Sequence, residues 1–191
     1  MATAILDPGR RDFLLKSTTA LSIGAAAMTA VPFLASWLPT EATRLGGLPI
    51  SIDLTKLAEG EGLKLLWRGT PMWIVRRPGA LVAQLDANRD RLKDPDSVES
   101  IQPDYALNAH RSARPDVIVL TAICTHLGCL PEFKATADAQ LGPDLDAGFY
   151  CPCHGSRFDL AGRVMKGSPA PTNLPIPIYH LADADTLVIG A

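Results

Sequence analysis

The chain contains the stretches Cys124–Cys129 (CTHLGC) and Cys151–Ser156 (CPCHGS), two cysteine–histidine boxes that decide its fold. Together they hold every cysteine of the chain and two of its four histidines. Two loops that each offer sulfur and imidazole suit a [2Fe–2S] cluster in which one iron binds two Cys and the other binds two His. Neutral imidazoles make such a cluster less negative, so it accepts an electron more readily than an all-cysteine cluster does.

In this interpretation four residues would be the iron ligands, namely Cys124, His126, Cys151 and His154. The two cysteines left over, Cys129 and Cys153, can form a disulfide that ties the boxes together. Closing a loop of roughly 20 residues in this way contributes about 3 kcal/mol in the chain-entropy treatment. Structural zinc is the alternative, but its usual C-x₂₋₄-C and H-x₃₋₅-H spacings do not match these boxes. The second box is also one residue short of the haem motif C-x-x-C-H.

Beyond the boxes, the chain resembles the Rieske iron–sulfur subunits of cytochrome bc complexes. The resemblance covers nearly the whole chain, and besides the boxes it rests on Trp67–Pro71 (WRGTP), Asp94–Ser97 (DPDS), Gln102-Pro103 and Gly167–Pro171 (GSPAP). It implies a mainly β fold with an N-terminal transmembrane helix. A Rieske antiparallel β sandwich follows, with a cluster-binding subdomain inserted at about residues 119–171. The implied cofactor is one Rieske-type [2Fe–2S] cluster.

The resemblance also implies a function. The chain would take one electron and a proton from quinol and pass the electron to a c-type cytochrome. It would act as a subunit of a quinol:cytochrome c oxidoreductase, a translocase, and would not be active alone. The implied partners are cytochrome b, a c-type cytochrome, quinol and membrane lipid, in a dimeric complex. His154 and His126 would be the catalytic residues, because an imidazole bound to iron is a stronger acid than a free one and regains its proton on reduction.

Around the cluster, the resemblance implies hydrogen bonds that withdraw negative charge from sulfur and so favour reduction. The Ser156 hydroxyl would donate to a bridging sulfide. Backbone N–H groups would serve other sulfurs, and these are expected around Leu127, Gly128, Cys129 and Gly155. The stretch Gly167–Pro171, which we name the proline loop, would cover the cluster with Pro169 at its centre.

Phe158 departs from the family pattern. High-potential members usually carry Tyr at this position and donate its hydroxyl to a ligand cysteine, here Cys124. Phenylalanine keeps the packing and removes the donor. One hydrogen bond contributes about 0.5–1.5 kcal/mol net, and about 59 mV corresponds to a tenfold change for a one-electron couple. We therefore expect the midpoint potential of the cluster to be roughly 20–65 mV lower than it would be with Tyr at this position.

The N-terminal segment is predicted to be a membrane anchor. Residues 9–16 (GRRDFLLK) resemble a twin-arginine export signal. The uncharged stretch 17–38 would span about 33 Å as a helix, enough for a hydrocarbon core near 30 Å. We expect a cytoplasmic segment 1–16, a transmembrane anchor 17–38, a flexible hinge 39–47 and a head domain 48–191. Arg10, Arg11 and Lys16 flank only the N-terminal end of the anchor, which by the positive-inside rule places the N-terminus in the cytoplasm and the head in the periplasm of a bacterial inner membrane. A cleaved signal peptide is the alternative.

The head domain shows mostly strand patterns. Strands are expected at residues 50–54, 63–67, 72–76, 117–122, 176–180 and 186–189, and one helix at 80–91. The acidic stretch 132–148 is interpreted as a solvated loop, and Trp67 and Trp73 as core or interface aromatics. His110 and His180, outside the boxes, are interpreted as structural or surface residues.

Charge and composition limit the other functions. The 18 Lys and Arg against 20 Asp and Glu leave no basic surplus for nucleic acid. The alternative function is the small Rieske subunit of a periplasmic molybdenum oxidase such as arsenite oxidase, which often carries Phe at the position of Phe158. A Rieske ferredoxin or ring-hydroxylating oxygenase domain normally lacks the extra cysteine pair and an export signal. A zinc-binding structural protein is the remaining alternative.

Overall fold

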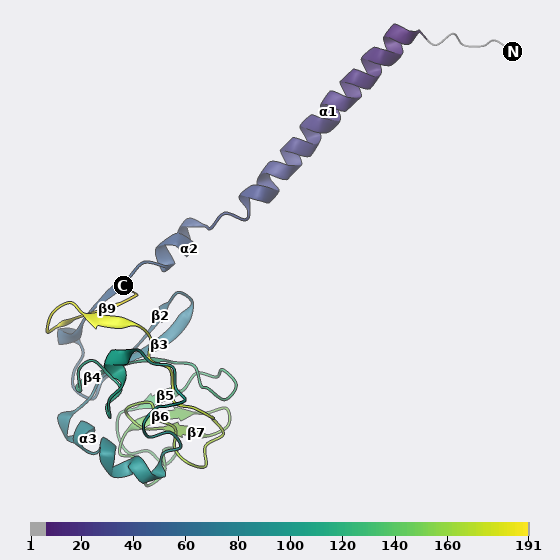
Figure 1. Cartoon of the computed structure of the whole chain (residues 1–191). Coiled ribbons are helices and arrows are strands. Elements are labelled where there is room, and N and C mark those ends of the chain that lie inside the picture. The colour runs from purple at the N-terminus through teal and green to yellow at the C-terminus, as the bar shows by residue number, and fades with distance from the viewer. Residues whose placement is uncertain (1–6, 191) are drawn as a thin grey trace. The chain divides into compact units, whose positions relative to one another are not determined.

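The structure is a computed structural model that describes residues 7–190, apart from the side chain of Ala42. The chain divides into two compact units, the first ending at Leu45 and the second beginning at Gly46 (Figure 1). Residues 1–6 of the expected cytoplasmic segment lie outside the described residues.

The first unit contains the helix α1, Pro8–Ala35, which is long and apolar enough to cross a membrane. The Asp7 carboxylate accepts the Gly9 N–H at 2.9 Å and caps its start. The helix begins at Pro8 rather than at residue 17, because Arg10, Arg11 and Lys16 before the apolar stretch are also good helix formers. Lys16 pairs with Asp12 one turn away at 2.8 Å, which supports this added part of the helix.

The short helix α2, Glu41–Gly46, lies at the boundary between the two units. It lies within the segment 39–47, where the sequence indicated no regular structure. Thr40 Oγ1 accepts the Thr43 N–H at 3.2 Å, which caps the first turn. Arg44 and Glu41 form an exposed pair at 3.5 Å. A polar stretch with a cap and one such pair is too short to give a recognisable apolar period.

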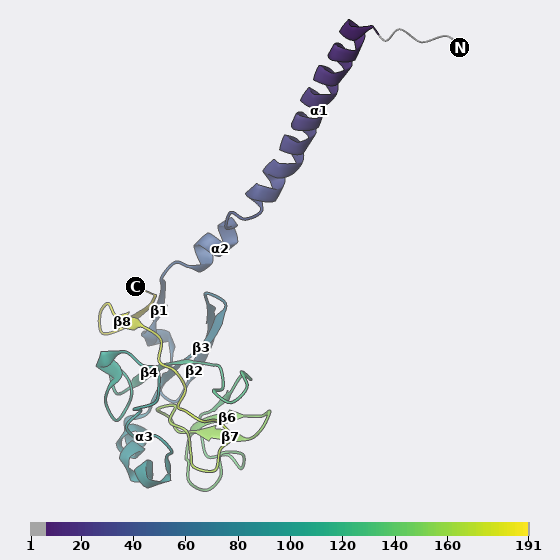
Figure 2. The same cartoon turned by 45° about the vertical axis from the view of Figure 1, so that its right-hand side comes forward.

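The second unit is built from three-stranded antiparallel sheets (Figures 1 and 2). The first sheet has the order β1-β9-β8, with β1 Ile50–Asp53, β9 Thr186–Ile189 and β8 Tyr179–Leu181. The second has the order β2-β3-β4, with β2 Gly62–Trp67, β3 Thr70–Arg76 and β4 Val117–Thr121. The third has the order β5-β6-β7, with β5 Glu132–Lys134, β6 Gly148–Cys151 and β7 Ser156–Phe158.

The main core centres on β4, whose residues from Val117 to Leu120 are at most 1% exposed. The same core includes Phe149 and Phe158 of the third sheet together with Cys124 and Cys151. The first cysteine of each cysteine–histidine box is therefore buried in the main core of the head domain.

Most strands predicted in the head are confirmed, and the differences have local causes. The strand expected at 176–180 begins only at Tyr179, because Pro175 and Pro177 have no N–H to donate to a sheet. The helix expected at 80–91 is instead the short α3, Gly79–Ala83, followed by the 3₁₀ helix η2, Leu85–Arg91. Asp and Asn within this stretch are weak helix formers, so the apolar spacing alone does not sustain an α-helix.

The interpretation of 132–148 as a solvated loop is wrong in part. The segment begins with β5, and its residues Leu141 and Leu145 are at most 3% exposed in a small second core with Leu92 and Met165. Short strands and isolated leucines carry too little periodicity to be recognised in one sequence.

Candidate metal centre

Each box folds into the same hydrogen-bonded turn. The Gly128 N–H donates to the Cys124 carbonyl at 3.0 Å, and the Gly155 N–H donates to the Cys151 carbonyl at 2.9 Å. Both glycines have positive φ, +81° and +75°, which glycine adopts without steric cost. The two cysteines thus occupy equivalent positions at the starts of two similar turns. These two N–H groups, which we expected to serve sulfur, donate to main-chain carbonyls in the structure.

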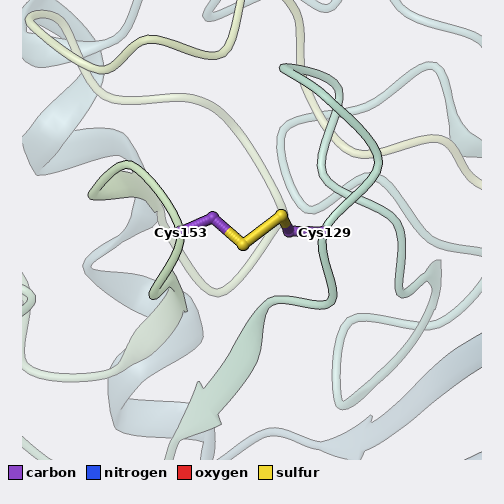
Figure 3. Close-up of a disulfide and its surroundings, with 2 residues drawn as sticks. All are labelled: Cys129 and Cys153. Atoms are coloured by element: carbon purple, nitrogen blue, oxygen red, sulfur yellow. A yellow bond between two sulfur atoms is a disulfide. The ribbon is translucent and has the colours of Figure 1, made fainter.

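A disulfide joins the two boxes. It links Cys129 to Cys153 across a sequence separation of 24, with their Cα atoms 6.5 Å apart. Figure 3 shows that the two cysteines come from separate loops that face one another. The cross-link fixes the spacing of the turns that carry the other cysteine and histidine residues.

Cys124 and Cys151 are free thiols, and each is only 2% exposed. Burial raises the pKa of the Cys124 thiol, the backbone N–H of His126 opposes that shift, and the neighbouring Cys151 adds to it. The sulfurs of Cys129, Cys151 and Cys153 also lie within 4.8 Å of one another. Two of those sulfurs are consumed by the disulfide, so Cys124 rather than either of them is the available partner of Cys151.

The two box histidines lie against one another. The rings of His126 and His154 meet edge to face, with centroids 4.8 Å apart and an interplanar angle of 89°. His154 is exposed and His126 is half-buried. The Nδ1 atom of His126 is buried and has no hydrogen-bond partner among the described residues. Buried polar atoms are nearly always paired, so this nitrogen is available for a metal.

These residues fit the mixed cluster predicted from the sequence. Two buried thiols sit at equivalent turns, and two adjacent imidazoles include a buried nitrogen without a partner. Two sulfur and two nitrogen donors on cross-linked loops match the ligands of a [2Fe–2S] cluster that binds one iron through Cys and the other through His.

The surroundings of the boxes are partly as expected. Ser156 is fully buried, and its Oγ accepts the Ala170 N–H of the proline loop at 3.0 Å. Phe158 is also fully buried, and its side chain has no hydrogen-bond donor. Pro169 is exposed at the surface of the proline loop, and Leu127 is 71% exposed beside His126.

Sequence reasoning missed two side chains that hold these loops. The Thr125 hydroxyl donates to the Thr172 carbonyl at 2.7 Å, tying the first box to the chain after the proline loop. The Lys93 ammonium donates to two carbonyls of the proline loop. Neither contact has a signal in the sequence, because the partners are far apart along the chain.

The histidines outside the boxes take the roles expected of them. The His110 carbonyl accepts from Arg77 at 2.9 Å, and burial lowers the pKa of the His110 ring. His180 is exposed on β8.

Comparison with known proteins gives consistent matches. The family model for the Rieske [2Fe-2S] domain matches residues 81–180. The chain is 44% identical to the ubiquinol-cytochrome c reductase iron-sulfur subunit of Allochromatium vinosum, over 95% of this chain and 88% of that one. It is 34% identical to the mitochondrial Rieske subunit of the cytochrome b-c1 complex of Rattus norvegicus, over 93% of this chain and 58% of that one. A solved structure titled as a hyperthermophilic respiratory Complex III matches with 27% identity and a TM-score of 0.48, over 87% of this chain and 98% of that one.

Proposed function

Because this chain belongs to the family of Rieske iron–sulfur subunits of ubiquinol-cytochrome c reductases, we propose that it carries electrons from quinol to a c-type cytochrome. It is a membrane-anchored subunit of that oxidoreductase complex, with cytochrome partners and one [2Fe–2S] cluster. The small subunit of a molybdenum oxidase, the alternative considered from the sequence, is not favoured by these relatives.

Four residues are proposed to hold the cluster: Cys124 and Cys151 on one iron, His126 and His154 on the other. The observation that carries this assignment is the buried Nδ1 of His126, which has no partner among the described residues although it lies beside the paired boxes. When bound, the cluster supplies one-electron redox chemistry.

The two imidazoles are proposed to handle the proton. Ligation of His126 through its buried Nδ1 leaves Nε2 of the same ring to hold a proton. His154 is the more exposed ring, so it is the one suited to accept a hydrogen bond from the quinol hydroxyl and then its proton. Quinol loses protons together with electrons, so a basic nitrogen at this surface assists its oxidation. The chain is proposed to be inactive alone, because the rest of the quinol pocket must come from cytochrome b.

The membrane arrangement is also a proposal. We place α1 across a bacterial inner membrane with its N-terminus in the cytoplasm and the head in the periplasm, exported by the twin-arginine route. The basic residues Arg10, Arg11 and Lys16 precede the apolar part of α1, as the positive-inside rule requires. A disulfide between the boxes supports the same side, because such bonds persist outside the reducing cytosol. Residues 39–47 would serve as a hinge, in a dimeric complex that works as a translocase.

Metal and sulfide analysis tests this proposal directly. The complex purified in detergent should contain iron and acid-labile sulfide in equal amounts in this subunit, and its reduced form should give an electron paramagnetic resonance signal. Replacing Cys124 by Ser should abolish that signal, whereas replacing the exposed His180 by Gln should leave it unchanged. A colourless subunit containing zinc would contradict the proposal.

A further inference from the structure

One lysine holds the proline loop from outside. Lys93 Nζ donates to the Ser168 carbonyl at 2.6 Å and to the Ala170 carbonyl at 2.8 Å. These are the carbonyls on either side of Pro169, so a single ammonium fixes both ends of the exposed part of the loop. Hydrogen bonds from a charged donor are roughly twice as strong as neutral ones.

The N–H group that lies between the two carbonyls held by Lys93 contacts Ser156. The Ala170 N–H donates to Ser156 Oγ at 3.0 Å, and both residues are fully buried. A serine hydroxyl has one hydrogen to donate, and here its oxygen already accepts from the loop. The hydroxyl hydrogen is therefore directed away from Ala170 and is left to donate elsewhere, as a donor to cluster sulfur must.

Main-chain contacts, and not the Lys93 side chain, hold the backbone of Lys93 in place. Its N–H donates to the Val164 carbonyl at 3.0 Å. The preceding residue, Leu92, forms an antiparallel bridge with Met165, and both are at most 2% exposed. A variant without the ammonium should therefore keep the backbone of this segment in place.

We propose that Lys93 is a positioning residue for the iron–sulfur centre, which by holding the proline loop keeps Ser156 oriented as a donor to sulfur and so favours reduction. Lys93 lies at the exposed surface, where water and salt screen its charge, so its effect is transmitted by hydrogen bonds rather than by its electric field. The inference rests on the proposed [2Fe–2S] function.

The midpoint potential of the purified complex, followed by electron paramagnetic resonance, tests this role. Lys93→Met should lower the potential by the equivalent of about threefold to tenfold weaker electron binding. Lys93→Arg, which can still donate to both carbonyls, should restore the wild-type value. The matched control is Lys166→Met, because the Lys166 ammonium is also exposed but donates to the Asp90 carbonyl at 2.7 Å. An unchanged potential in Lys93→Met, or an equal fall in Lys166→Met, would overturn the inference.

A double-variant cycle and hydrogen exchange test the route through Ser156. In a Ser156→Ala background, Lys93→Met should cause no further fall, because the donor that it orients is gone. Additive falls would refute this route. Amide exchange in the peptide spanning residues 156–171 should be faster in Lys93→Met than in Lys166→Met, and equal rates would count against the clamp. A wild-type complex without a reduced-cluster signal would instead refute the proposed function.

Discussion

Asp159 and Arg163 form an ion pair, 2.8 Å between Oδ2 and Nε, in which the two side chains are 3% and 0% exposed. The same carboxylate accepts the N–H groups of Ala161 and Arg163 and so closes the turn after β7. Arg77 and Arg111 are buried as well, and burial lowers the pKa of each to about 10, while the charge of Asp159 opposes that shift. Asp159 therefore stabilises several buried positive charges at once.

We predict that Asp159→Asn destabilises the chain by about 3–5 kcal/mol, because it leaves buried guanidinium groups without a compensating charge. Asparagine keeps Oδ1 for the two N–H groups, so the loss reports the ion pair at Oδ2, where the amide NH2 cannot accept from Arg163 Nε. Urea unfolding of the full chain in detergent, followed by tryptophan fluorescence, measures the effect. The control is Asp116→Asn, which breaks the half-exposed pair with Arg114 and should cost less than about 1 kcal/mol. Equal losses in the two variants would show that burial of the pair does not matter.

A second prediction concerns the buried Phe158 beside the boxes. Phe158→Tyr should raise the midpoint potential of the cluster by roughly 20–65 mV, because the added hydroxyl can donate to a ligand sulfur. The measurement is a redox titration of the purified complex. Phe133→Tyr is the control, since Phe133 is half-buried on β5 against Trp73, with the ring centroids 6.0 Å apart. A flat or lowered potential in Phe158→Tyr would mean that the hydroxyl does not reach sulfur.

The sequence was sufficient to predict the features that depend on residues close together along the chain. The boxes, the apolar stretch of α1 and the strands β1 and β9 have motifs or alternation that can be read from neighbouring residues. The expected strands 63–67 and 72–76 are likewise found, joined by a two-residue turn at Arg68-Gly69 in which both residues have positive φ.

What could not be predicted depends on partners far apart along the chain. The sheet β5-β6-β7 is made of three- and four-residue strands that are stable only because Phe149 and Phe158 pack into the common core. The contact from Lys93 to the proline loop crosses 75 residues of sequence. The buried Nδ1 of His126, which has no partner within residues 7–190, is likewise a product of packing, although the residue itself was identified from its box.

A third prediction follows from Tyr179. Its ring is 3% exposed, its hydroxyl oxygen accepts the Ala113 N–H at 3.0 Å, and burial raises its pKa from 10.0 to about 12. Between these values the unfolded chain loses this proton before the folded chain does. Stability from this group is therefore complete below about pH 10 and is lost as the pH rises toward 12, by about 2–3 kcal/mol.

Unfolding free energies measured by urea between pH 8 and 11 test this prediction. Tyr179→Phe should flatten the alkaline part of the profile, although it also lowers stability at neutral pH by about 1 kcal/mol through the lost hydrogen bond. His180→Gln, which changes the exposed neighbouring residue on β8, should keep the wild-type slope. Parallel alkaline profiles for wild type and Tyr179→Phe would exclude Tyr179 as the group responsible.

The last prediction concerns the start of the head domain, where the hairpin turn between β2 and β3 holds the incoming chain. Arg68 Nη2 donates to the Gly47 carbonyl at 2.8 Å, and Trp67 Nε1 donates to the Leu48 carbonyl at 2.9 Å. The Arg68 guanidinium also lies 4.4 Å from the centroid of the Trp67 ring. The hairpin turn therefore holds residues 47 and 48 against the head domain.

Arg68→Asn should release this segment without disturbing the hairpin, because Asn tolerates the φ of +50° that Arg68 adopts. The lost hydrogen bonds are exposed, so we expect the free energy that holds this segment against the head to fall by about 1 kcal/mol. That loss corresponds to roughly fivefold faster proteolysis at residues 46–48. The midpoint potential should be unchanged. Arg44→Asn, which removes an exposed arginine from α2, is the control and should be cut there at the wild-type rate. If Arg68→Asn were cut no faster than this control, the turn would not be holding the segment. The hairpin that makes these contacts lies 21 positions further along the chain than Gly47, so no local pattern in the sequence indicates them.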